Sequence, residues 1–235
     1  MKKAKSILCC ALALVFIAII AYSGYRIAEI QANYKKEADM HHAAMVYKPE
    51  PTPDHVNQSI IDLQAEHPDV AGWITIPNTG IDYPFVWYQD NDYYLRRNLN
   101  GDYALAGTVF MDFRCQKDFT SQNTILYGHH MKNGSMFGTL KAFGDKDFFD
   151  ENRRGTIYLP RETLTLTFFA YMLVNSSTEK EIYNAALSDG YFDYVKKNAR
   201  HYRDLGLTES DRMVTLSTCA YEFDNARMVL LGKVL

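Results

Sequence analysis

The feature that most constrains this chain is a stretch without any charged residue, which runs from Ser6 to Tyr25. A helix of that length spans roughly 30 Å, the thickness of the hydrocarbon core of a bilayer. Lys2, Lys3 and Lys5 precede the stretch, whereas charges of both signs follow it. Because flanking lysines stay on the cytoplasmic side, the pattern predicts a single transmembrane anchor in the cell membrane, with the N-terminus inside.

The alternative for this stretch is a cleaved signal peptide. Such a peptide has an apolar core of only roughly 7–15 residues and a cleavage site of the small-x-small kind, which Ala18-Ile-Ile-Ala-Tyr-Ser matches poorly. We therefore favour a cytoplasmic tip and anchor over residues 1–25, followed by a polar, helix-prone stalk over residues 26–53 that ends among three prolines. The folded domain is expected over residues 54–235, outside the cytoplasm.

Charge and cysteine content narrow the class of protein further. The net charge is −3 and no basic stripe is present, so nucleic acid is not expected as a partner. Of the four cysteines, Cys9 and Cys10 fall in the apolar stretch, where they are expected to act as small apolar residues. Cys115 and Cys219 are too few for a disulfide framework. A free thiol outside the cytoplasm is a liability unless the protein uses it.

The domain is expected to be mainly β. About eight short runs are rich in β-branched and aromatic residues and are bounded by Gly, Pro, Asn or Asp, which is typical of strands. They cover residues 72–77, 81–87, 107–112, 124–128, 155–159, 164–174, 213–218 and 227–232. Helical spacing of apolar residues predicts one helix over 54–66. A second helical region, interrupted at Ser188-Asp-Gly, is expected from Ser177 to about Leu205, where Ser177 or Thr178 could cap it. That number of strands is enough for a closed or nearly closed barrel.

The run that ends at Cys219 carries the first candidate for chemistry. If residues 213–218 form a strand, alternation places Thr215, Ser217 and Cys219 on one polar face. A thiol at the end of a core strand, beside hydroxyls, is well placed to meet a substrate. From these residues alone, a buried structural cysteine is an equally good interpretation.

A nucleophilic cysteine needs a neighbouring base or cation. Of the histidines, only those in Tyr127-Gly-His129-His130 lie at the end of an expected strand. Neighbours on a strand point to opposite faces, so we expect one of the two to face a groove and no metal site from the pair. No metal or cofactor is predicted.

Arg227 is the third candidate, because a short turn separates it from the thiol. A hairpin of that length brings the guanidinium near Cys219, where it could donate hydrogen bonds to a substrate carbonyl or a developing oxyanion. The alternative is a salt bridge with Glu222 or Asp224 in the turn.

Together, Tyr-Gly-His-His-Met, Thr-Leu-Ser-Thr-Cys and an arginine after a short turn resemble the sortase family, specifically class B. The resemblance covers residues from about 54 to 235, and the inside N-terminal anchor also matches. It implies an eight-stranded sortase-like barrel with an N-terminal helix and a helix before the cysteine strand. It also implies a cysteine transpeptidase of a Gram-positive bacterium, which anchors exported proteins to the cell wall.

The resemblance further implies residue roles. Cys219 would attack the threonine carbonyl of a C-terminal sorting signal, His129 rather than His130 would protonate the departing amine, and Arg227 would steady the carbonyl oxygen. An amine of the peptidoglycan precursor or cross-bridge would then resolve the thioacyl enzyme. The residues that resemble positions of the substrate groove are Asn91, Leu95, Tyr127 and Ser217.

Three other functions stay open at this point: a pilin polymerase with a lysine acceptor, a non-catalytic wall-binding barrel, and a secreted cysteine protease. Class B relatives often favour Asn-Pro-x-Thr-type signals, but the class does not fix the motif. Cys115 belongs to no motif, and it is expected either as a half-buried cysteine at a strand end or, near Cys219, as the partner in an inactivating disulfide.

Overall fold

The computed structural model describes residues 2–51 and 56–235. The chain divides into two compact units, Met1–Ala43 and Ala44–Leu235. The boundary expected near Asp54 lies outside the described residues, so the three-part division of the chain stays a prediction. The helix expected over 54–66 is found as α2 (Gln58–Glu66), and its first two expected residues, Asp54 and His55, also lie outside the described part.

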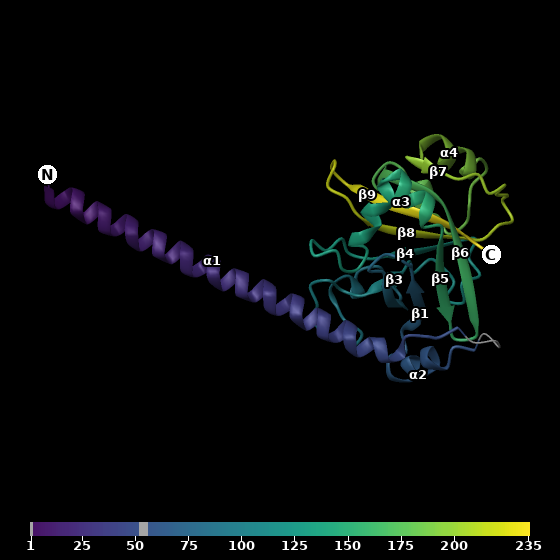
Figure 1. Ribbon diagram of the computed structural model, residues 1–235, viewed down its shortest axis with the longest axis horizontal. Coiled ribbons are helices and arrows are strands. Elements are labelled where there is room, and N and C mark those ends of the chain that lie inside the picture. The colour runs from purple at the N-terminus through teal and green to yellow at the C-terminus, as the bar shows by residue number, and fades with distance from the viewer. Residues whose placement is uncertain (1, 52–55) are drawn as a thin grey trace. The chain divides into compact units, whose positions relative to one another are not determined.

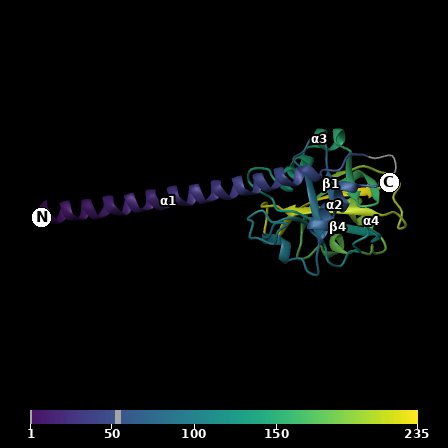
Figure 2. The same ribbon diagram turned by 90° about the horizontal axis from the view of Figure 1, so that it is seen from below.

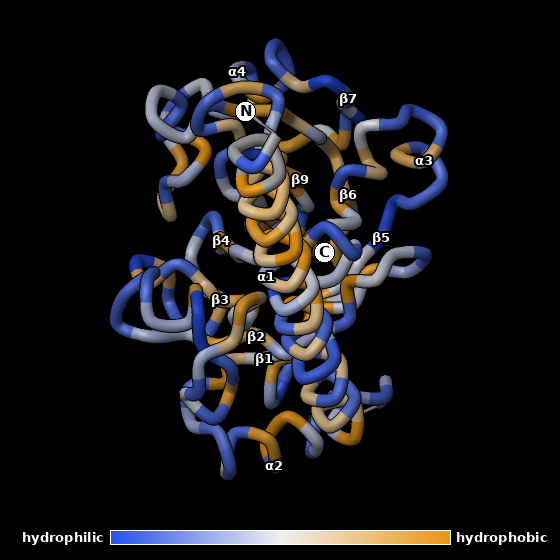
Figure 3. The backbone as a smooth tube through the Cα atoms, turned by 90° about the vertical axis from the view of Figure 1, so that its left-hand side faces the viewer, coloured by the Kyte–Doolittle hydropathy of each residue, from blue (hydrophilic) through white to orange (hydrophobic). Residues whose placement is uncertain are grey.

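The first unit is helical throughout its described length. Helix α1 (Lys2–Ala44) includes the whole charge-free stretch and continues through the polar segment that follows it. After a hydrophilic first turn, which carries the lysines, the turns of the N-terminal half of α1 are hydrophobic (Figure 3). Among the described residues, this is the one helix long and apolar enough to cross a membrane.

The second unit is a closed β-barrel (Figure 1). Nine strands form one sheet, in the order β5-β1-β2-β3-β4-β8-β9-β6-β7. The pairing of β5 with β6 closes eight of them into a barrel, and β7 attaches to β6. The strands are β1 (Val70–Thr75), β2 (Asp82–Trp87), β3 (Val109–Met111), β4 (Asn123–Tyr127), β5 (Arg154–Leu159), β6 (Glu162–Asn175), β7 (His201–Tyr202), β8 (Met213–Cys219) and β9 (Ala226–Val234).

Each of the eight expected runs forms a strand, so the predicted mainly β barrel is confirmed. Two neighbouring pairs, β2–β3 and β4–β8, are parallel, and the others are antiparallel. From Met213 to Thr218, every residue of β8 is buried, including the hydroxyl residues. The polar face expected for this strand therefore meets protein rather than water until the strand reaches Cys219.

Short helices cover the ends and sides of the barrel. Helix α2 lies over one end (Figures 1 and 2), where Ile60 and Leu63 pack against Val70 and Trp73 of β1. The remaining helical segments are η1 (Met45–Tyr47), η2 (Tyr93–Arg96), η3 (Gly138–Gly144), α3 (Lys146–Glu151), η4 (Lys180–Tyr183) and α4 (Tyr191–Asn198). Helix α4 confirms the expected helix before the cysteine strand.

The boundaries expected for that helical region were wrong. Residues 177–190 form turns and the short 3₁₀ helix η4, and neither Ser177 nor Thr178 caps a helix. The Asn175 side chain accepts a hydrogen bond from the Ser177 backbone N–H at 3.0 Å, a local bond that competes with helix formation. Gly190, in the left-handed region at φ 76°, is the N-cap residue that precedes α4. The chain becomes extended at Ala199, and His201–Tyr202 then pair with β6 as the unexpected strand β7.

Candidate active site

The β8–β9 hairpin places Cys219 directly opposite Arg227. These two residues are cross-strand partners in the ladder, in which Ser217 also pairs with Val229. The backbone N–H of Ala220 donates to the Ala226 carbonyl at 2.9 Å and closes the turn beyond them. Directly opposite residues of an antiparallel pair have Cβ atoms only about 4.5–5.5 Å apart. The hairpin therefore places the side chains of Cys219 and Arg227 as neighbours at the end of the barrel.

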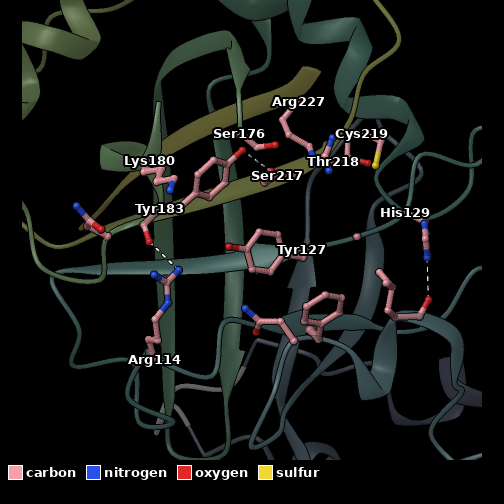
Figure 4. A pocket seen from close by; sticks show the side chains of 15 residues that line it. Arg114, Tyr127, His129, Ser176, Lys180, Tyr183, Ser217, Thr218, Cys219 and Arg227 are labelled. Atoms are coloured by element: carbon pink, nitrogen blue, oxygen red, sulfur yellow. Dashed lines mark hydrogen bonds between the residues drawn. The ribbon is translucent and has the colours of Figure 1, made fainter. Parts of the chain in front are cut away.

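A pocket of about 470 Å³ opens at this end of the ladder. It is lined by all of the residues predicted for catalysis or substrate binding, namely Asn91, Leu95, Tyr127, His129, Ser217, Cys219 and Arg227. Four segments of the chain contribute them, and Figure 4 shows the β8–β9 residues above Tyr127 with His129 at one end. The structure thus brings the whole predicted set to one pocket, while the role of each residue stays a prediction.

His129 follows the end of β4 and is oriented by a backbone carbonyl. Its Nε2 lies 2.7 Å from the Leu95 carbonyl oxygen, on the end of the ring that faces away from Cys219 in Figure 4. Because a carbonyl only accepts, Nε2 carries the proton in the neutral ring and Nδ1 is the nitrogen with a free lone pair. Burial lowers the pKa of His129 below its ordinary value; the bond to Leu95 opposes this shift, and the positive charge of Arg96 adds to it.

His130 serves the backbone rather than the pocket. Its Nδ1 lies 2.9 Å from the carbonyl oxygen of Cys219, and its ring packs against that of Tyr221, with centroids 5.3 Å apart. The two neighbouring histidines therefore differ in position: His129 is among the pocket residues, and His130 contacts the Cys219 carbonyl and the Tyr221 ring at the start of the turn. In residues 2–51 and 56–235, no cluster of three His, Cys, Asp or Glu side chains is arranged to hold a metal ion.

Arg227 does not form the alternative salt bridge. Its Nη1 donates to the adjacent Ala226 carbonyl at 2.9 Å, and none of the ion pairs among the described residues joins it to Glu222 or Asp224. A guanidinium has five N–H donors, so most of them are left for a ligand in the pocket.

Sequence reasoning missed several residues that line the pocket: Arg114, Ser176, Lys180, Tyr183 and Asn184. Tyr183 is buried, and its hydroxyl lies 3.1 Å from Oγ of Ser217. Burial raises the pKa of Tyr183 to about 12, which keeps the phenol protonated. Tyr183 was expected in a long helix, so no sequence signal directed it to the barrel. Arg114 lies two residues after Asp112, and this pair of opposite charges at a strand end is a sequence signal that could have identified it.

Cys115 is a structural cysteine. It is 2% exposed, rather than half-buried as expected, and its thiol lies 3.5 Å from the Asn123 carbonyl oxygen. Burial raises its pKa to about 11, which suppresses thiolate formation. Both Cys115 and Cys219 are free thiols, and Cys115 is not among the residues that line the pocket.

An eight-stranded barrel that presents a cysteine opposite an arginine, with a histidine in the same pocket, has the side chains of an enzyme that acts through a cysteine nucleophile. Comparisons with known proteins agree. The sortase domain family matches residues 74–234. Sortase B of Listeria monocytogenes is 33% identical, over 99% of each chain. A mutant form of Clostridium perfringens sortase B superposes with a TM-score of 0.77, at 29% identity, over 83% of this chain and 96% of its own.

A class B sortase of Streptococcus pyogenes, which is involved in pilus biogenesis, superposes with a TM-score of 0.69 at 30% identity, over 74% of this chain and 97% of its own. The chain belongs to the sortase family and, within it, to the class B cysteine transpeptidases.

Proposed function

We propose that this class B sortase is tethered to the membrane, cleaves a sorting signal of an exported protein after threonine, and transfers the acyl group to a peptidoglycan amine. The observation that carries the proposal is the direct pairing of Cys219 with Arg227 in a pocket that also contains His129. An uncharged helical stretch from Ser6 to Tyr25 supports the tether. The likeness to class B sortases along nearly the whole chain supports the substrate class.

The first half of the reaction forms a thioester. The thiolate of Cys219 attacks the threonine carbonyl carbon, and the carbonyl oxygen gains the negative charge. Guanidinium N–H groups of Arg227 donate to that oxygen, because oxyanion stabilisation acts where the charge develops. The carbon–nitrogen bond then breaks as the imidazolium of His129 gives its proton to the departing amine.

The second half reverses these transfers with a new amine. The acceptor amine attacks the thioester carbonyl carbon, neutral His129 takes a proton from it, and the carbon–sulfur bond breaks to release the Cys219 thiolate. Because the Nε2 proton of His129 is bonded to the Leu95 carbonyl, Nδ1 is the atom that exchanges protons with substrate. The lowered pKa of His129 makes its imidazolium a better proton donor than an ordinary histidine, and a minor species at neutral pH.

The test is product analysis by mass spectrometry with the full chain in detergent. The substrates are a library of Asn-Pro-x-Thr- and Leu-Pro-x-Thr-type peptides, with a diamino acid as acceptor. We expect cleavage after threonine, a product joined to the acceptor, complete loss with Cys219→Ala and full activity with Cys115→Ala. If the acceptor leaves the hydrolysis product unchanged in amount, the protein is a simple protease. If Cys219→Ala retains activity, the proposed nucleophile is wrong.

A pilin-polymerising function is the second candidate, and the pilus-associated Streptococcus pyogenes relative favours including it. The two functions share the site and differ in the acceptor. A lysine-containing peptide and a peptidoglycan stem fragment, offered together in equal amounts, would compete for the thioacyl enzyme. Wall anchoring predicts mainly the stem-fragment product, whereas a dominant isopeptide to the lysine peptide would favour polymerisation.

A further inference from the structure

A buried carboxylate lies behind one wall of the pocket, and the reaction proposed above does not use it. Asp112 follows the end of β3 and is 0% exposed. Its Oδ1 accepts from the backbone N–H and from Nε of Arg114, at 2.9 and 2.8 Å. Its Oδ2 accepts from Nη2 of Arg114 at 2.7 Å, from the Tyr127 hydroxyl at 2.9 Å and from Nδ2 of Asn91 at 3.2 Å. A buried charge with this many donors is fully compensated.

The carboxylate determines which way the Asn91 amide faces. An ionised carboxylate can only accept, so the NH₂ group of Asn91 must face Asp112. The Asn91 oxygen in turn accepts from the Phe113 backbone N–H at 3.1 Å. These two bonds use one amide hydrogen and the oxygen of Asn91. The second amide N–H is left for an acceptor on a ligand, because Asn91 lines the pocket.

The same carboxylate connects the other parts of this wall. Hydrogen bonds from Arg114 and Tyr127 keep the pKa of Asp112 below its usual range, although burial alone would raise it. Burial and the Asp112 charge together raise the pKa of Tyr127, which therefore remains a donor. Arg114 also donates to the Tyr183 backbone carbonyl at 2.8 Å (Figure 4). The Asp112 carboxylate thus connects Asn91, which precedes η2, with Tyr127 at the end of β4. Through Arg114 it is also connected to Tyr183 in η4.

We propose that Asp112 is a positioning residue of the substrate pocket: it holds Asn91 and Tyr127 so that the Asn91 amide N–H can bind an acceptor, such as a peptide carbonyl, of the sorting signal. The proposal rests on the proposed function only in taking a peptide as the ligand. A merely structural ion pair would stabilise the fold and leave substrate affinity unchanged once the protein is folded.

The test compares Asp112→Asn with Asp118→Asn in the full chain. Asp118 is an exposed carboxylate that hydrogen-bonds Thr120 in the following loop, so it is a matched control. In Asp112→Asn, the Arg114 side chain that loses its partner is 45% exposed, so water can reach it. We expect KM for the cleaved peptide to rise about tenfold or more, with a smaller change in kcat. Alkylation of Cys219 by iodoacetamide, followed by peptide mapping, should keep its wild-type rate.

A double-mutant cycle with Asn91→Ala separates positioning from general damage. If Asp112 acts through Asn91, the Asp112→Asn change should raise KM much less when Asn91 is already alanine. An unchanged KM in Asp112→Asn, a fully additive cycle, or a parallel loss of Cys219 alkylation would overturn the proposal. If Asp112→Asn fails to fold, the Asp112→Asn/Arg114→Gln pair, which leaves no unpaired charge, takes its place in the same measurements.

A readout without substrate keeps the two proposals separate. The side-chain amide signal of Asn91 in a ¹⁵N–¹H spectrum, assigned by its loss in Asn91→Ala, should shift in Asp112→Asn and stay in place in Asp118→Asn. Failure of the wild-type protein to cleave any peptide would count against the proposed function alone. An amide signal that is insensitive to Asp112→Asn would count against the positioning role alone.

Discussion

The two sides of the pocket are built by different means. Cys219 and Arg227 belong to one β-ladder, and backbone pairing sets their register. His129, Asn91 and Leu95 lie outside the strands, and hydrogen bonds to carbonyl or carboxylate groups orient His129 and Asn91. A ladder cannot slip by one residue without turning every side chain to the other face. The strand side is therefore preorganised by the fold itself, whereas single side-chain changes can alter the loop side.

This difference orders the expected effects of substitution. Changes on the strand side should remove chemistry without moving the backbone. Apart from loss of the His129 imidazole itself, changes on the loop side should alter substrate affinity, the pKa of His129 or the stability of the protein in smaller steps. Each of the following predictions tests one side against the other.

After the complete loss expected for Cys219→Ala, Arg227→Ala should have the largest effect. Loss of a preorganised oxyanion donor costs about 10²–10³ in kcat. Because the ladder bonds come from the backbone, we expect Cys219 to remain in place and to be alkylated by iodoacetamide at close to the wild-type rate. Single-turnover acylation by the cleaved peptide is the measurement. The control is Arg200→Ala, which removes an arginine that is not among the pocket residues. An acylation rate within a few-fold of wild type would remove Arg227 from the mechanism.

Tyr183→Phe, a change on the loop side, should lower the free energy of unfolding of the protein. The change leaves the Ser217 hydroxyl, which is 1% exposed, without its partner, and the loss of one buried hydrogen bond costs about 1 kcal/mol. Urea unfolding measures it. In Tyr183→Phe/Ser217→Ala no hydroxyl is left unpaired, so we expect part of the loss to be recovered. A double variant that loses the sum of the two single effects would show that the hydroxyls do not interact.

Arg96→Gln should raise the pKa of His129, because the charge of Arg96 is one of the causes that lower it. A larger share of the enzyme would then hold the imidazolium at neutral pH, and kcat/KM there should rise modestly. Titration of the His129 ring protons by NMR gives the pKa, and kcat/KM at pH 7 gives the consequence. Lys132→Gln is a suitable control. A pKa that falls in Arg96→Gln would contradict the electrostatic explanation.

The smallest expected effect is on the pH dependence of stability. A histidine whose pKa is lower in the folded protein binds fewer protons there than in the unfolded chain. The stability that neutral His129 contributes is complete above the ordinary histidine pKa of about 6.5. That stability is lost as the pH falls through this value toward the folded-state pKa. His129→Gln should therefore lose less stability than wild type between neutral pH and pH 5. Denaturant unfolding at both pH values decides this, and an identical loss in both proteins would exclude the effect.

The strand side could be predicted well from the sequence because its information is local. Alternation and turn residues located all eight barrel strands, and the short hairpin after Cys219 predicted its approach to Arg227. Tyr183 and Asp112 could not be placed in this way. The sequence around Tyr183 is compatible with a helix, and only the turn that begins at Asn175 prevents one. The burial of Asp112 depends on donors from two distant segments, Asn91 and Tyr127, as well as on the nearby Arg114.

The most direct test of the central claim is the location of the acyl group during turnover. Wild-type protein mixed with the cleaved peptide, quenched in acid and digested, should carry the acyl mass on the peptide that contains Cys219, and a diamino acceptor should discharge it. Arg227→Ala should accumulate the same adduct far more slowly at the same site. An adduct on any other residue, or turnover without an adduct on Cys219, would contradict the account.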